Sequence, residues 1–179
     1  MIKVQNSQFD LPILYLNPVY LSQGDGTIIS YTDGSQHTDK RNIRSIRRAL
    51  CKYFALDYSA LRNKFRDHCD IGLPPLMLKP GYVLLPIKTR IARCKGDPCY
   101  AYINLYYVAS VVEQTGLEGR STINFNNGTG ISCHNTVKTI KNKIMLAKSV
   151  DEKSQAAGHK DQAIKEILDL FSKILRKDK

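Results

Sequence analysis

The feature that most constrains the fold is a series of short apolar runs separated by turn-forming residues. Residues 76–78 and 82–87 are two such runs, and Pro80 and Gly81 lie between them. Residues 121–125 and 129–133 form a second pair, joined by Asn127 and Gly128, which are typical of a tight hairpin turn. Because short runs joined by tight turns pair antiparallel, the sequence predicts an antiparallel, meandering sheet.

Two stretches of the chain change from this pattern to the helical period. Asp39 is the expected N-cap of a helix that runs to about Phe54, and Asp57 can cap a short second helix. The helical period returns after residue 134, with a cap at Asn135 or Thr136. The expected fold class is α+β, with a strand-rich antiparallel meander, a basic helix pair after the N-terminal strands, and C-terminal helices.

The length of 179 residues is sufficient for one hydrophobic core. We expect a single domain over residues 1–148, a linker over residues 149–160, and an amphipathic C-terminal helix over residues 161–179. The remaining strands of the domain are expected at residues 11–16, 19–21, 27–31, 100–105 and 108–112.

The net charge of the chain indicates an anionic partner. Lysine and arginine number 27 against 16 acidic residues, which gives a formal net charge of +11. Nucleic acid and acidic membrane are the usual partners of such a charge. The longest weakly charged stretch, residues 99–113, is too short to span a membrane, and the N-terminus lacks the pattern of a secretory signal. We therefore expect a cytoplasmic protein that binds nucleic acid and no membrane.

The charge is concentrated between Asp39 and Arg66, where nine basic residues face two acidic ones. The basic residues are Lys40, Arg41, Arg44, Arg47, Arg48, Lys52, Arg62, Lys64 and Arg66. A charge run is often only a solvated face, but this one is unbalanced and rich in arginine, which favours contacts with phosphates. A helix-turn-helix is the alternative interpretation, although the segment between the two helices contains no glycine.

A second basic segment covers residues 88–95 and carries Lys88, Arg90, Arg93 and Lys95. It is either an exposed loop or an arm that follows a groove of the duplex, since basic side chains on an extended segment often read a narrow minor groove. On the second interpretation, Arg90 and Arg93 are the best candidates to enter the groove.

The cysteines and the motif content do not indicate an enzyme. Five scattered cysteines are expected to be reduced thiols. Cys94 and Cys99 could form half of a zinc site, but their spacing is not that of a familiar zinc module, so we expect no metal and no cofactor. The sequence has no local nucleophile signature, metal-binding helix, phosphate-binding glycine loop or dinucleotide fingerprint.

Several segments, in order and over about residues 28–148, resemble the competence transcription factor ComK family of Gram-positive bacteria. The segments are Cys51-Lys52-Tyr53-Phe54-Ala55 with Tyr58 and Arg62, Pro74-Pro75-Leu76-Met77-Leu78 with Val83-Leu84-Leu85-Pro86, Cys99 with Tyr102-Ile103, and Phe125-Asn126-Asn127-Gly128. Tyr102 stands where that family usually has tryptophan. A fainter likeness to the LytTR class of DNA-binding domains covers Tyr102-Ile103-Asn104-Leu105, Asn127-Gly128 and Ile131.

The ComK resemblance implies a sequence-specific DNA-binding activator that recognises paired AT-rich boxes, largely through the minor groove, as a self-associated protein. Duplex DNA, a second copy of the chain and RNA polymerase are the partners expected on this basis. If the LytTR class is the closer relative, loops of a strand-rich domain would enter major grooves instead.

Two other functions remain open. The chain could be a non-catalytic protein interaction module whose C-terminal helix docks a partner or pairs with its own copy. It could also bind RNA, because Tyr100, Tyr102, Tyr106 and Tyr107 could stack on bases.

Overall fold

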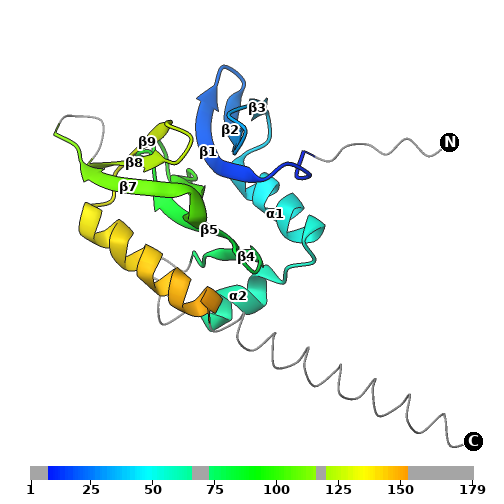
Figure 1. Cartoon of the computed structure of the whole chain (residues 1–179). Helices are drawn as coiled ribbons and strands as arrows, with labels where there is room; N and C mark the ends of the chain where they lie inside the picture. The colour runs from blue at the N-terminus through cyan, green and yellow to red at the C-terminus, as the bar shows by residue number, and fades with distance from the viewer. Residues whose placement is uncertain (1–7, 66–72, 116–119, 153–179) are drawn as a thin grey trace, which may run out of the picture.

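The fold is built on two antiparallel sheets (Figure 1). A computed structural model describes residues 8–65, 73–115 and 120–152 of the chain. Within them, a six-stranded sheet has the order β3-β2-β1-β6-β5-β4, and a three-stranded sheet has the order β7-β8-β9. The strands are β1 (Ile13–Leu21), β2 (Gly24–Tyr31), β3 (Gln36–Asp39), β4 (Leu76–Lys79), β5 (Tyr82–Lys88), β6 (Tyr100–Asn104), β7 (Val108–Glu113), β8 (Ser121–Phe125) and β9 (Gly130–Cys133). The predicted α+β class and antiparallel pairing are confirmed.

The first strand is longer than the sequence indicated. The runs at residues 11–16 and 19–21 belong to the single strand β1, which contains Pro18 and pairs with β2 along its length. Proline lacks the N–H that a ladder on both sides would need. It is tolerated here because β6 pairs with β1 only at Tyr15 and Leu16, so one side of Pro18 has no ladder to interrupt.

The prediction that Asp39 caps the first helix is wrong. Asp39 ends β3, a strand whose polar sequence gives no strand signal, and its carboxylate accepts a hydrogen bond from the Arg41 N–H. Helix α1 (Ile43–Tyr53) begins after Asn42, whose side chain accepts from the Ser45 N–H at 3.0 Å. Helix α2 (Tyr58–Lys64) has Asp57 as its N-cap, as predicted.

The six-stranded sheet is buried on both faces. Successive side chains of a strand point to opposite faces, and the consecutive residues Tyr15 and Leu16 of β1 are both buried. Leu16 lies in one core with Leu50 of α1, whereas Tyr15 lies in a second core with Phe125 of β8 and Ile140. The sheet therefore lies between α1 and a layer formed by β7–β9 and a helix over residues 137–152 (Figure 1).

The helix over residues 137–152 begins after Thr136, whose hydroxyl accepts from the Thr139 N–H at 3.2 Å. Asn135, the other predicted cap, instead accepts a hydrogen bond from the Lys88 N–H. The helix continues through residues 149–152, which the sequence placed in a linker, and residues 153–179, with the predicted final helix, lie outside the described residues. Among the helices that are described, none has the length and apolar character needed to cross a membrane.

Candidate nucleic-acid interface

Helix α1 separates its apolar and basic residues onto different faces. Its inner face is buried and carries Ile46 and Leu50, while Arg44, Arg48 and Lys52 are exposed. These three cations are four residues apart, so they form one stripe along the helix. No acidic residue lies in the first turn. The stripe is therefore a positive surface that no neighbouring carboxylate of α1 neutralises.

Two other arginines of the predicted basic run between Asp39 and Arg66 are held by contacts with neighbouring side chains. Arg41 pairs with Asp39 at 2.5 Å, and this contact lowers the pKa of the Asp39 carboxyl. Arg47 is half-buried, and its Nη1 donates to the hydroxyls of Tyr58 (3.0 Å) and Tyr102 (3.2 Å). Its guanidinium also lies 4.0 Å from the centroid of the Tyr58 ring. Arg47 thus joins α1, α2 and β6.

The loop over residues 89–99, which contains most of the second basic segment, is called the connector. Its shape is fixed by Asp97, whose Oδ2 accepts hydrogen bonds from the Tyr20 hydroxyl (2.5 Å) and the backbone N–H groups of Arg93 (2.7 Å) and Cys94 (3.1 Å). The Cys94 thiol donates to the other carboxylate oxygen at 2.9 Å. These donors, the thiol foremost, hold the pKa of Asp97 well below its usual range.

The two arginines of the connector contact the same ring but differ in exposure. The guanidinium groups of Arg90 and Arg93 each lie 3.9 Å from the centroid of the Tyr20 ring. Arg90 also bonds Asp25 at 2.7 Å and the Pro98 carbonyl at 2.7 Å, and its side chain is only 11% exposed. Arg93 is exposed, as is Lys95. Arg90 therefore anchors the connector, while Arg93 is presented to solvent.

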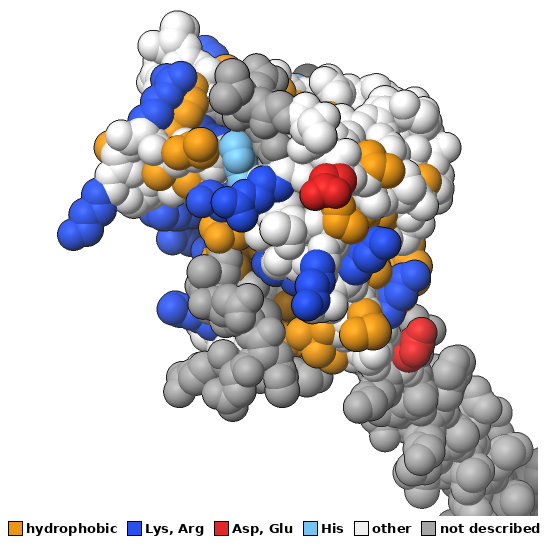
Figure 2. All heavy atoms as spheres, turned by 90° about the vertical axis from the view of Figure 1, so that its left-hand side faces the viewer, with side chains coloured by type: hydrophobic (Ala, Val, Ile, Leu, Met, Phe, Trp, Pro, Cys, Tyr) orange, Lys and Arg blue, Asp and Glu red, His pale blue; other side chains and the backbone are white. Residues whose placement is uncertain are grey.

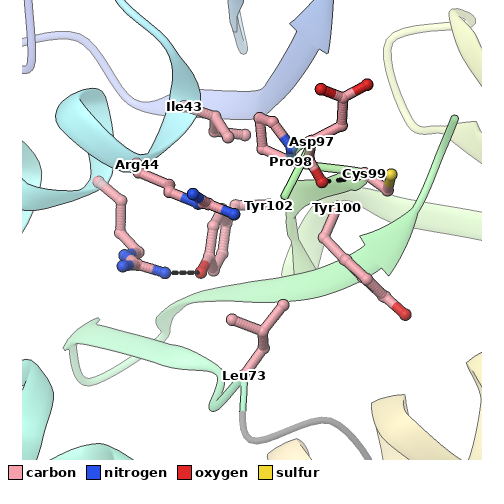
Figure 3. Close-up of a pocket in the computed structure, with 9 residues that line it drawn as sticks. Ile43, Arg44, Leu73, Asp97, Pro98, Cys99, Tyr100 and Tyr102 are labelled. Atoms are coloured by element: carbon pink, nitrogen blue, oxygen red, sulfur yellow. Dashed lines mark hydrogen bonds between the residues drawn. The ribbon is translucent and has the colours of Figure 1, made fainter. Parts of the chain in front are cut away.

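The connector and α1 meet. Nη2 of Arg44 donates to the Gly96 carbonyl at 2.6 Å, across 52 positions of sequence. A pocket of about 250 Å³ opens beside this contact and is lined by residues of α1, the connector and β6 (Figure 3). We call the exposed cations of the two elements the joint basic surface. Its members are Arg44, Arg48, Lys52, Arg93 and Lys95.

The other residues of the predicted site lie apart from this surface or outside the description. Arg62 is exposed on α2. Lys88 ends β5, is half-buried, and its backbone bonds His134 and Asn135. The side chain of Lys64 and the whole of Arg66 lie outside the described residues.

A further set of cations was not included in the predicted site. Arg120, Lys138, Lys141 and Lys148 are all exposed. Figure 2, which views the molecule from the side of the three-stranded sheet, shows basic side chains spread among apolar ones with few acidic side chains. The three lysines occupy positions i, i+3 and i+10 of the helix over residues 137–152, and this spacing is the sequence signal that could have grouped them.

The tyrosines and cysteines have mixed environments. Tyr102 is 2% exposed and Tyr106 is 39% exposed, so of these two only Tyr106 could offer a ring to a base. Burial raises the pKa of Tyr102.

Cys94 is exposed, and Cys51, Cys99 and Cys133 are buried free thiols. Within the described ranges, no group of three or more His, Cys, Asp or Glu residues could hold a metal ion.

Comparison of the chain with known protein families, with curated proteins and with solved structures finds no match.

Proposed function

We propose that this chain binds duplex DNA through the joint basic surface and regulates transcription, as the likeness of its sequence to the ComK family implies. The observation that carries the proposal is the meeting of two basic segments, distant in sequence, at the contact between Arg44 and Gly96. A solvated charge run needs no such convergence, whereas cations of different elements on one surface can contact several phosphates and fix the orientation of the protein on a duplex.

The members of the surface have different tasks. Arg44, Arg48 and Lys52 on α1 contact phosphates and supply affinity that is independent of sequence. Arg93 extends from a connector that Asp97 and Arg90 hold in place, so its direction is set before binding. A pre-positioned arginine at the rim is suited to a narrow, AT-rich minor groove. Arg90 acts through the connector and does not enter the groove itself.

On this proposal the chain acts in the cytoplasm as a self-associated activator of transcription, and RNA polymerase is a further partner. The C-terminal helix is the proposed element of self-association. Ending the chain at Lys160 should then convert an oligomer into a smaller species in light scattering while DNA binding to a single site persists. An oligomer of unchanged size would contradict this assignment of the helix.

A salt-titrated gel shift with AT-rich duplex, GC-rich duplex and single-stranded RNA tests the function. Five exposed cations, each neutralising one phosphate, predict a slope of log K against log salt of about −4.5 on duplex DNA. The AT-rich duplex should bind most tightly, and Arg93→Gln should reduce that preference. Preferred binding of the RNA would instead favour the RNA-binding alternative, and binding that is insensitive to salt would rule the proposal out.

A further inference from the structure

The pocket at the junction of α1, the connector and β6 combines two cationic side chains with apolar and aromatic walls. Arg44 and Arg47 line it from α1, and Ile43, Leu73, Tyr100 and Tyr102 are among its other lining residues (Figure 3). At about 250 Å³ it lies just below the usual size of small-molecule sites, so it has room for a phosphate and one sugar or base ring, with the rest of a larger ligand outside it.

No carboxylate of the described residues forms an ion pair with Arg47. This guanidinium is half-buried, and its hydrogen bonds go to two neutral tyrosine hydroxyls. A charge withdrawn from water is costly unless a counter-charge replaces the lost solvation. Neither Arg47 nor Arg44 forms a salt bridge with a carboxylate of the described residues. Two arginines on one wall with no carboxylate partner among the described residues favour an anion, and a phosphate has enough oxygens to accept from the forked donors of both.

The one carboxylate among the described residues of the pocket wall does not pair with these arginines. Asp97 lines the pocket, but its carboxylate points away from Arg44 in Figure 3 and accepts hydrogen bonds from Tyr20, Arg93 and Cys94. Its backbone carbonyl accepts from the Cys99 thiol at 3.5 Å. The Asp97 carboxylate is thus occupied by other donors, and the rest of the described wall offers apolar and ring surface.

We propose that this pocket binds a nucleotide unit, with its phosphate between Arg44 and Arg47 and its sugar or base against Tyr100 and Leu73. The unit is either a free nucleoside monophosphate or one nucleotide of a bound polynucleotide. The polynucleotide form of the inference rests on the proposed DNA-binding function, whereas the free form does not.

Leu73→Trp tests the pocket without changing the charge, because the larger side chain fills the cavity next to the arginines. Arg44→Gln removes one of the two cations from an exposed position. Lys141→Gln is the matched control, since it removes one positive charge on the far helix over residues 137–152. Each folded variant is titrated by calorimetry with adenosine 5′-monophosphate, adenosine and inorganic phosphate, and by anisotropy with a fluorescent AT-rich duplex.

In the calorimetric titrations, which are the first arm of the test, adenosine monophosphate should bind more tightly than adenosine or phosphate. Its affinity should fall at least tenfold in Leu73→Trp and Arg44→Gln and should stay unchanged in Lys141→Gln. If adenosine monophosphate does not bind but Leu73→Trp weakens duplex binding at least tenfold, the occupant is a nucleotide of the polynucleotide. Either result supports the pocket.

The inference is overturned if wild-type protein does not bind adenosine monophosphate and Leu73→Trp binds the duplex as wild type does. It is also overturned if adenosine monophosphate binds but neither pocket variant weakens it. If Leu73→Trp does not fold, Arg44→Gln is compared with Arg48→Gln, because Arg48 does not line the pocket. An equal loss of ligand affinity in these two variants rejects the site. Failure of the wild type to bind any duplex would refute the proposed function alone and leave the first arm to decide on the pocket.

Discussion

Replacing Arg90 by methionine should destabilise the protein far more than the same replacement of Arg93. The two guanidinium groups lie equally close to the Tyr20 ring, at 3.9 Å from its centroid. They differ in what else they contact. Arg90 is 11% exposed and bonds Asp25, whose side chain is 26% exposed, and the Pro98 carbonyl. Arg93 is exposed and forms no ion pair with another described residue.

The magnitudes follow from these environments. Removing one partner of a fully buried ion pair costs about 3–5 kcal/mol. The loss should be smaller for Arg90 because Asp25 keeps some contact with water, and because Nη1 of Arg90 is buried with no hydrogen-bond partner among the described residues. We expect Arg90→Met to cost about 2–3 kcal/mol. Arg93→Met should lose only an exposed cation–π contact, about 0.5–1 kcal/mol.

Urea unfolding measures the difference, which should appear as a shift of the midpoint with an unchanged slope m. In thermal unfolding, Arg90→Met should lower Tm by about 4–12 °C. Duplex binding should show the reverse order, with the salt slope reduced by about 0.9 in Arg93→Met and unchanged in folded Arg90→Met. Equal losses of stability in the two variants would refute the assignment of Arg90 to anchoring and Arg93 to contact.

Three further predictions concern the fold that carries the surface. Asn42→Ala should cost about 1 kcal/mol in urea unfolding because α1 loses its N-cap, and an effect below about 0.3 kcal/mol would contradict the capping geometry. The pKa of Asp97 is lowered in the folded protein, so its carboxylate stabilises the fold above the unfolded pKa of about 4, and this stability is lost as the pH falls. Asp97→Asn should therefore weaken the loss of stability at acid pH in a profile of unfolding free energy against pH. An unchanged loss at acid pH would count against the role of these hydrogen bonds. Leu84→Ala, at a fully buried position of β5, should cost about 2–5 kcal/mol in the same unfolding assay, and a near-neutral result would mean that the core is wrongly described.

The sequence predicted the parts of the fold that depend on local chemistry. The hairpin of β4 and β5 follows from Pro80 and Gly81, and that of β8 and β9 from Asn127 and Gly128. The cap of α2 at Asp57 is equally local. The polar strand β3 was missed because its pairing with β2, and not its own residues, makes it a strand. Because β3 was missed, Asp39 was predicted to cap α1. In the structure Asp39 ends β3, and Asn42 is the cap of the helix.

The site was predicted less completely because its geometry depends on contacts that are distant in sequence. The concentration of charge between Asp39 and Arg66 grouped Arg47 with the other basic residues, but its partner Tyr102 lies 55 positions away. The anchoring of Arg90 depends on Asp25, at 65 positions. Composition alone cannot distinguish a cation held by such partners from one that is free to contact a ligand. The two basic segments were both recognised, whereas their meeting at Arg44 and Gly96 was not.

The most direct test of the central claim compares the salt dependence of duplex binding in two triple variants of equal charge. One carries Arg44→Gln, Arg48→Gln and Lys52→Gln on the joint basic surface, and the other carries Lys138→Gln, Lys141→Gln and Lys148→Gln on the far helix. We expect the slope of log K against log salt to become less steep by about 2.7 in the first variant and to stay at the wild-type value in the second. Equal changes in the two variants would show that net charge, and not the surface where α1 meets the connector, determines binding.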